Sequence, residues 1–141
     1  MLYFFRHILC NEWYFVLLMG LLSRGIIIIT MMGITPLLHI GAANNGVNFG
    51  WEVFSAWDSV LYQQIASNSY DTLDTKPGSN VAFFPLFPLL IRLGTIVGFP
   101  SNIVGVIINN TAFILTLFVV YIWVKKTNDA LAARWVVAVL A

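Results

Sequence analysis

Long apolar runs dominate the chain, and one polar stretch, from Gly41 to Asn80, interrupts them. About 20 consecutive apolar residues are enough to cross the hydrocarbon core of a bilayer as a helix. The pattern therefore predicts an all-α chain, one membrane domain over residues 1–141. We expect about three membrane-spanning helices, at approximately residues 17–40, 84–99 and 103–124.

The polar stretch is predicted to be an extracytoplasmic loop, residues 41–82. Within it apolar side chains recur at helical spacing, at Phe54, Trp57, Leu61 and Ile65. One apolar face on a short polar segment is typical of a helix that lies along the membrane surface, where Trp and Tyr are also enriched. We predict such an interfacial helix at about residues 54–67.

The apolar segment at 84–99 is short for a span and contains Pro85, Pro88 and Arg92. Each proline removes a backbone donor, so the segment could be a helix that begins after Pro88 or a bent, re-entrant one. We expect a true span. Gly94 and Gly98 form a pair of small residues four apart, which would let another helix approach closely.

The chain ends within an Ala-rich helical pattern that starts near residue 130. The segment 130–141 is too short to cross a membrane, so it is expected to be a truncated fourth helix. The pattern favours an N-terminal fragment of a longer protein.

Composition supports the membrane assignment. The chain is 60% hydrophobic and 9% charged, with a mean hydropathy of +0.87, whereas soluble domains are roughly a quarter charged. We expect an integral, multi-pass membrane protein surrounded by lipid. The net charge of +1 provides no basic field for nucleic acid. A single cysteine, Cys10, excludes a Cys/His metal set of the usual kind.

Charge placement predicts the orientation of the chain in the membrane. Arg6 and His7 precede the first span and the loop carries an acidic excess, so the positive-inside tendency puts the amino terminus inside and the loop outside. If residues 84–99 cross, Lys126 lies outside; if they re-enter, it lies inside. A true span implies the outside location. Arg24 is expected near one end of the first span, where its side chain can reach the interface.

Asp58 is the strongest candidate for chemistry. A carboxylate in an interfacial loop beside aromatic side chains could act as a general base towards a substrate hydroxyl, or it could bind a divalent cation. A structural alternative is also open. Ser55, followed three residues later by Asp58, fits a capping box, in which Asp58 would only secure the first helical turn.

One combination of motifs resembles the family of GPI mannosyltransferase 2 and its bacterial relatives. That family carries Trp-Asp, Ile-Ala and Gly-Tyr elements in its first outer loop, followed by an Ala-Phe-Phe-Pro-x-x-Pro-Leu segment. The matching positions are Trp57-Asp58, Tyr62, Ile65-Ala66, Tyr70, Ala82-Phe83-Phe84-Pro85-Leu86-Phe87-Pro88-Leu89-Leu90 and Arg92. Two departures are visible: the usual Gly-Tyr is Ser69-Tyr70 here, and the family's enzymes have many more spans.

The resemblance implies a membrane glycosyltransferase. Such an enzyme would transfer a sugar, typically mannose, from a polyprenyl-phosphate donor to a hydroxyl of a lipid or glycan acceptor on the extracytoplasmic face. Asp58 matches the family's catalytic loop acid, and Trp57, Tyr62, Tyr70 and Arg92 are the expected substrate-binding residues. Arg92, or alternatively Arg24, could meet the donor phosphate, since a guanidinium pairs bidentately with phosphate oxygens. No cofactor is required, and a divalent metal ion remains an option at Asp58.

Two other functions remain open. The chain could be a non-catalytic membrane subunit, or an inactive fragment of such an enzyme, that packs against a partner through Gly94 and Gly98. It could also be a transporter component, in which Arg24 and Arg92 would line a polar path, although the polar residues gather in one loop. The membrane would be the plasma membrane in a bacterium and the endoplasmic reticulum in a eukaryote.

Overall fold

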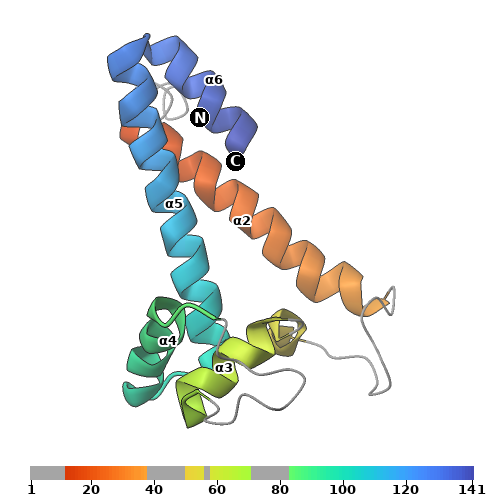
Figure 1. Cartoon of the computed structure of the whole chain (residues 1–141). Helices are drawn as coiled ribbons and strands as arrows, with labels where there is room; N and C mark the ends of the chain where they lie inside the picture. Colours follow the sequence, from red (N-terminus) through yellow and green to blue (C-terminus); the bar gives the residue numbers. More distant parts are fainter. Residues whose placement is uncertain (1–11, 38–49, 56–57, 71–82) are drawn as a thin grey trace. The chain divides into compact units, whose positions relative to one another are not determined.

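The computed structural model describes residues 12–37, 50–55, 58–70 and 83–141 (Figure 1). Their regular structure is helical throughout, with no strand in these ranges, which confirms the all-α prediction. The elements are α2 (Glu12–Leu37), the 3-10 helix η1 (Gly50–Phe54), α3 (Asp58–Asn68), α4 (Leu86–Ile96), α5 (Ser101–Thr127) and α6 (Ala130–Leu140).

The chain divides into two compact units. We call Met1–Ile29 with Asn110–Ala141 the hairpin unit, and Thr30–Asn109 the short-helix unit. The first contains most of α2, most of α5 and all of α6. The second contains η1, α3, α4 and the first turns of α5.

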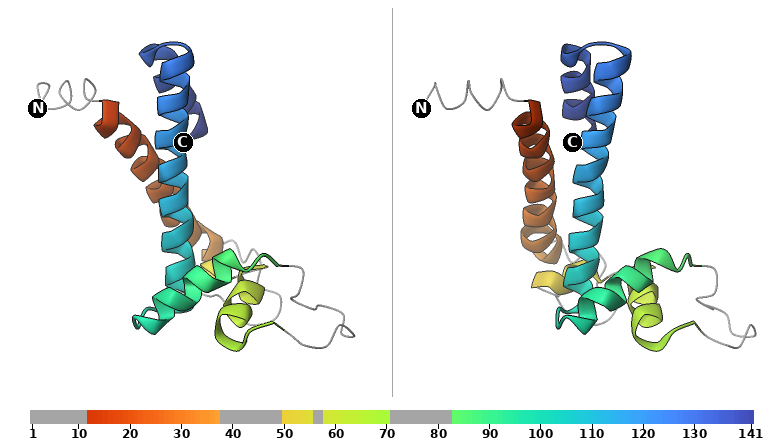
Figure 2. Two further views of the ribbon diagram at one scale, coloured as in Figure 1. Left: turned by 60° about the vertical axis from the view of Figure 1, so that its left-hand side comes forward. Right: turned by 90° about the vertical axis from the view of Figure 1, so that its left-hand side faces the viewer.

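The hairpin unit packs α2 and α6 against α5 (Figure 2). Its buried core consists of Val16, Leu117, Tyr121, Val124, Ala133 and Val137. The turn into α6 is fixed by Asp129, whose carboxylate Oδ1 accepts a hydrogen bond from the Ala132 N–H at 2.7 Å. This is an N-cap in the usual sense, because it satisfies one of the unpaired donors of the first turn. The helix predicted at residues 130–141 is confirmed.

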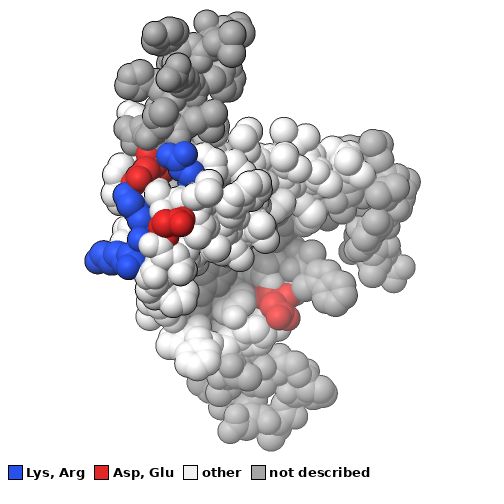
Figure 3. Space-filling model, turned by 90° about the horizontal axis from the view of Figure 1, so that it is seen from above, with Lys and Arg blue, Asp and Glu red and all other residues white. Residues whose placement is uncertain are grey.

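Within the hairpin unit α2 and α5 run antiparallel. Glu12 at the start of α2 forms an ion pair with Lys125 near the end of α5. About three turns further along α2, Arg24 lies over the ring of Phe113. Charged side chains of both signs gather at the Glu12 end of the unit (Figure 3). If both helices cross a membrane, the start of α2 and the end of α5 therefore lie on the same side.

Two helices are long and apolar enough to span a membrane, over Glu12–Ile34 and Ser101–Thr127. The first begins five residues before the predicted 17–40, and the second encloses the predicted 103–124. The expected third span is not confirmed. α4 has 11 residues, about 16 Å of helix against roughly 30 Å of hydrocarbon. Together with the antiparallel pairing of α2 and α5, this length favours the re-entrant alternative for residues 84–99.

α4 begins earlier than the prolines suggested. The helix starts at Leu86 with Pro85 at its N-cap, and Pro88 is buried in its first turn. A proline is tolerated there because the N–H groups of the first turn have no intrahelical partner in any case. The helix closes at Gly98, whose φ is +102°, and the Phe99 N–H donates to the Gly94 carbonyl at 3.3 Å.

Gly94 in α4 and Gly98 just beyond its end have different roles. A Cβ at Gly94 would lie 2.5 Å from Val104 Cγ1, so the first turns of α5 approach the backbone of α4, as the small-residue pattern predicted. Gly98 takes no part in this contact, because nothing lies within 4 Å of its Cβ position. Its role is conformational: a positive φ is costly for residues with a side chain.

The interfacial helix is shorter than predicted. The expected helix at 54–67 is divided into η1, which ends at Phe54, and α3, which starts at Asp58. The Ser55 N–H donates to the Glu52 carbonyl at 2.9 Å and so closes a 3-10 turn instead of continuing into an α-helix. Ile65 and Ala66 are buried in the short-helix unit, where Ala66 packs with Ile91 and Val104.

Candidate functional site

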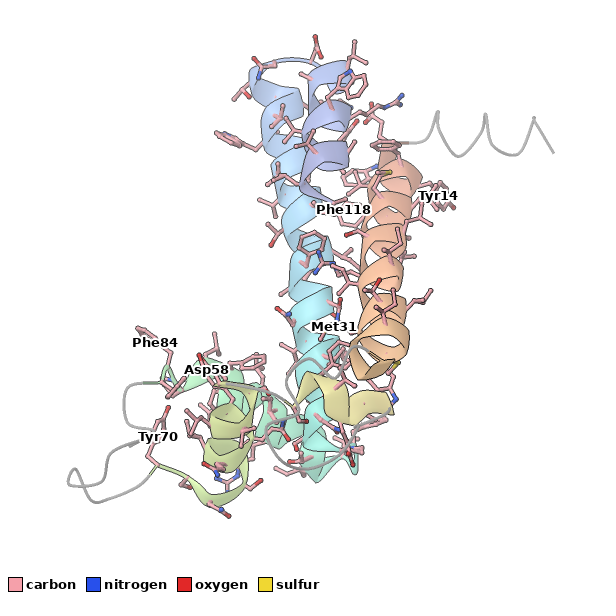
Figure 4. All side chains as sticks on the ribbon, turned by 90° about the vertical axis from the view of Figure 1, so that its right-hand side faces the viewer. Tyr14, Met31, Asp58, Tyr70, Phe84 and Phe118 are labelled. Carbon is pink, nitrogen blue, oxygen red and sulfur yellow. The ribbon has the colours of Figure 1, made fainter. Side chains whose placement is uncertain are left out.

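Asp58 is the first residue of α3, and its side chain is exposed. Figure 4 shows it at the start of the helix, with Tyr70 just beyond the other end. A negative charge is favourable in a first helical turn, because the unpaired N–H groups there create a partial positive charge.

The capping box that would have given Asp58 a structural role is not formed. The Ser55 N–H, which the Asp58 carboxylate would accept from in that motif, donates to the Glu52 carbonyl. The Ser55 hydroxyl, in turn, accepts a hydrogen bond from Gln63 Nε2 at 3.2 Å. Asp58 therefore belongs to the first turn of a helix that starts after Ser55, and its carboxylate faces solvent.

Tyr62 follows Asp58 by one helical turn, so the two side chains share a face of α3. The Tyr62 ring packs edge-on against Phe83 and Phe87, with ring centroids 5.0 Å apart in both pairs. Such edge-to-face pairs add about 0.5–1.5 kcal/mol beyond the burial of area. The aromatic cluster thus holds the first half of α3 against the start of α4, directly beside the candidate acid.

Tyr70 joins the same cluster from the far end of α3. Its hydroxyl donates to the Phe83 carbonyl at 2.7 Å. The chain reverses after α3 through Ser69, whose φ of 71° lies in the left-handed region. That region favours glycine, so a serine at this position carries some backbone strain.

Arg92 is not brought to Asp58. It is exposed on α4, one residue beyond the buried Ile91. Among the described residues the only ion pair is that of Lys125 with Glu12, so none links Arg92 to the carboxylate. Trp57, the other predicted binding residue, lies outside the described residues.

A polar link that the sequence did not reveal supports α3. The amide of Gln63 donates to Ser55 and, through Oε1, accepts a hydrogen bond from the Ser101 hydroxyl at 3.0 Å. The helical wheel places Gln63 on a polar face, but nothing in the pattern identifies Ser101, 38 residues away, as its partner. The link fixes η1, α3 and the start of α5 to one another.

The described residues of this region offer one exposed carboxylate, that of Asp58. Among the described residues no three His, Cys, Asp or Glu side chains gather closely enough to hold a metal ion. Asp58 with the Tyr62 cluster provides one carboxylate, an aromatic surface and access from solvent. Comparison with protein-family models, with curated proteins and with solved structures finds no match to this chain.

Proposed function

We propose that this chain is the catalytic-loop part of a membrane glycosyltransferase that uses a polyprenyl-phosphate sugar, most simply mannose, as donor. Asp58 is the general base. It removes the proton from an acceptor hydroxyl on a lipid or glycan as the oxygen attacks the anomeric carbon. The bond from that carbon to the phosphate oxygen breaks, polyprenyl phosphate leaves with the electron pair, and the configuration at the sugar inverts.

The observation that carries this proposal is the exposed Asp58 carboxylate in the first turn of α3, where the alternative capping role is not taken. A catalytic base must be reachable by its substrate and must not be engaged in a structural bond. The loop that holds Asp58 joins two helices that can each span a membrane. That location suits a donor whose lipid tail stays in the bilayer.

Two further features support the proposal. The aromatic cluster around Tyr62 offers ring surface next to Asp58, and a sugar could pack against such a surface. The left-handed Ser69 keeps the backbone that a Gly-Tyr element would have at this turn. Arg92 is exposed and would meet the donor phosphate only if the lipid approached along α4.

The test compares Asp58→Asn with Asp58→Ala in membranes that contain the full-length protein, with polyprenyl-phosphate mannose as donor. The Asn side chain keeps the shape but cannot accept the proton, so we expect mannosyl transfer to fall by on the order of a hundredfold or more in both variants. Transfer is measured as labelled sugar that moves into the acceptor fraction.

Protein level and membrane insertion serve as the control and should be unchanged in Asp58→Asn. Ser67→Ala, a change at an exposed residue of the same helix, is the matched variant and should keep full transfer. Normal transfer by a well-inserted Asp58→Asn protein would refute the catalytic role. If wild-type protein transfers no sugar but copurifies with a partner in fixed ratio, the non-catalytic subunit function is favoured instead.

A further inference from the structure

Arg24 lies in the middle of a helix that can span a membrane. In the segment Glu12–Ile34, twelve residues precede it and ten follow it. The ion pair of Glu12 with Lys125 places charged groups at one end of the same two helices, so Arg24 is about 18 Å along the axis from that end. The sequence predicted a location near one end of the first span, whereas a span over Glu12–Ile34 would put Arg24 near its middle.

In the part of the chain that the structure describes, no carboxylate pairs with Arg24. Its guanidinium lies over the Phe113 ring, 3.6 Å from the centroid, and Nη2 reaches the Ser23 hydroxyl at 3.5 Å. Nε is buried and has no hydrogen-bond partner among the described residues. A ring face attracts a cation but does not neutralise it. A charged side chain at the centre of a bilayer is costly and is normally paired.

We propose that Arg24 is the docking point for a further membrane helix, separate from α2 and α5, that carries an Asp or Glu at the middle of its span. Room for that helix exists on α2: Leu21 and Ile27, three residues on either side of Arg24, are 54% and 42% exposed. Phe113 holds one face of the Arg24 guanidinium from the α5 side. The N–H groups of the guanidinium are then left for the incoming carboxylate.

The acid must come from outside this sequence. The chain has six Asp and Glu residues, and all of them lie at the ends of the two candidate spans or beyond them. A second copy of the chain would therefore present Glu12 at the membrane surface and no acid at mid-depth. The partner is a different span, on another polypeptide or in a longer form of this protein.

A lipid phosphate is the less suitable ligand. The hydrocarbon core is about 30 Å thick, so headgroup phosphates lie roughly 15 Å from its centre. An arginine at mid-depth cannot cover that distance with its side chain. This argument applies equally to the phosphate of a polyprenyl donor, so the proposal for Arg24 is independent of the role of Asp58.

The experiment uses the chain in phospholipid vesicles with three synthetic single-span poly-leucine helices. One carries Glu at its midpoint, one carries Gln there, and one carries Glu near its end. Association is measured by energy transfer between labelled chain and labelled helix. We expect about tenfold tighter association with the midpoint Glu helix than with either control, because only that carboxylate reaches the guanidinium.

Two variants sharpen the result. Arg24→Gln should bind all three helices alike, and Arg24→Glu should prefer a helix with Lys at its midpoint. The wild-type comparison needs no variant, so a misfolded mutant cannot obscure the outcome. Equal binding of the Glu and Gln helices by the wild-type chain would overturn the proposal. Association that follows the fraction of anionic lipid rather than the midpoint residue would overturn it as well and indicate a headgroup site.

Discussion

The hairpin unit and the short-helix unit each place a glycine where α5 meets another helix, and the two contacts differ. In the hairpin unit a Cβ at Gly20 would lie 3.1 Å from Ile114 and 3.3 Å from Leu117. In the short-helix unit a Cβ at Gly94 would lie 2.5 Å from Val104. The first contact is tight but leaves at least 3.1 Å, whereas in the second both γ carbons of Val104 lie within 2.7 Å of the added Cβ.

Polar groups are also used differently in the two units. The short-helix unit is tied by specific hydrogen bonds, those of Gln63 with Ser55 and Ser101 and that of Tyr70 with Phe83. The hairpin unit relies on apolar packing, an ion pair at one end, and Arg24 over Phe113. The hydrogen-bonded short-helix unit therefore suits the proposed role of Asp58, and the hairpin unit suits the proposed docking of a helix at Arg24.

The largest expected effect is all-or-none: it is the side of the membrane from which two introduced cysteines can be labelled. With Cys10→Ser as background, a cysteine replaces Asn68 at the end of α3 or Lys126 at the end of α5. We expect an impermeant maleimide to label Asn68→Cys on intact cells and Lys126→Cys only after permeabilisation. The reason is the antiparallel pairing of α2 with α5, which returns the chain to the side of its start.

The same experiment tests whether α4 crosses. If Asn68→Cys and Lys126→Cys are both labelled on intact cells, residues 84–99 form a true span. The antiparallel pairing of α2 with α5 would then not hold in the membrane. Labelling of Glu12→Cys provides the reference for the inner side, because it lies beside Lys125.

The second prediction compares the glycine contacts directly. Gly94→Ala should lower the free energy of unfolding by about 1–2 kcal/mol: overpacking costs typically 1–3 kcal/mol, and the gain in helix propensity returns up to about 1 kcal/mol. Gly33→Ala, where nothing lies within 4 Å of the new Cβ, should be neutral or slightly stabilising. The readout is the midpoint of SDS-induced unfolding in mixed micelles.

A double variant identifies the cause. Val104→Ala removes the two methyl groups that the new Cβ would meet, so it should cost less in the Gly94→Ala background than in the wild type. Strictly additive losses would mean that the clash is not the origin of the effect.

The sequence predicted helices and their polar interruptions well, for a physical reason. A segment such as α5 is apolar over most of its length and has two lysines in its last turn, so its length and composition identify it. The depth of Arg24 in a membrane does not follow from the sequence. The first apolar run is longer than the roughly 20 residues that a bilayer needs, so different parts of it could form the span. The ion pair of Glu12 with Lys125 fixes how α2 lies against α5, which the apolar pattern alone does not indicate.

The candidate site was predictable to the extent that it is local. Asp58 and Tyr62 are four residues apart, and both lie in α3, so they share one face of that helix. The bond of Tyr70 to Phe83 and that of Gln63 to Ser101 depend on how α3 meets its neighbours. Gly98 and Pro100 are the kind of residues that follow the end of a helix, and α4 ends just before them, at Ile96.

The smallest expected effect is a gain in stability at Ser69, beside the candidate site. Its φ of 71° costs a residue with a side chain about 1–2 kcal/mol, and glycine avoids this strain. Glycine also loses more conformational entropy on folding than serine does, which costs about 0.5–1 kcal/mol. Strain relief outweighs that loss, so Ser69→Gly should stabilise the protein by about 0.5–1 kcal/mol in the same SDS titration.

Ser67→Gly is the matched control, two residues earlier and inside α3. Here the backbone is helical, so glycine brings only its lower helix propensity and the loss of the hydroxyl bond to the Gln63 carbonyl. This variant should be destabilised by about 0.5 kcal/mol. A gain at both positions would point to a general effect of glycine near the end of α3. A loss of stability in Ser69→Gly would show that residue 69 does not adopt the left-handed conformation in the protein that the titration measures.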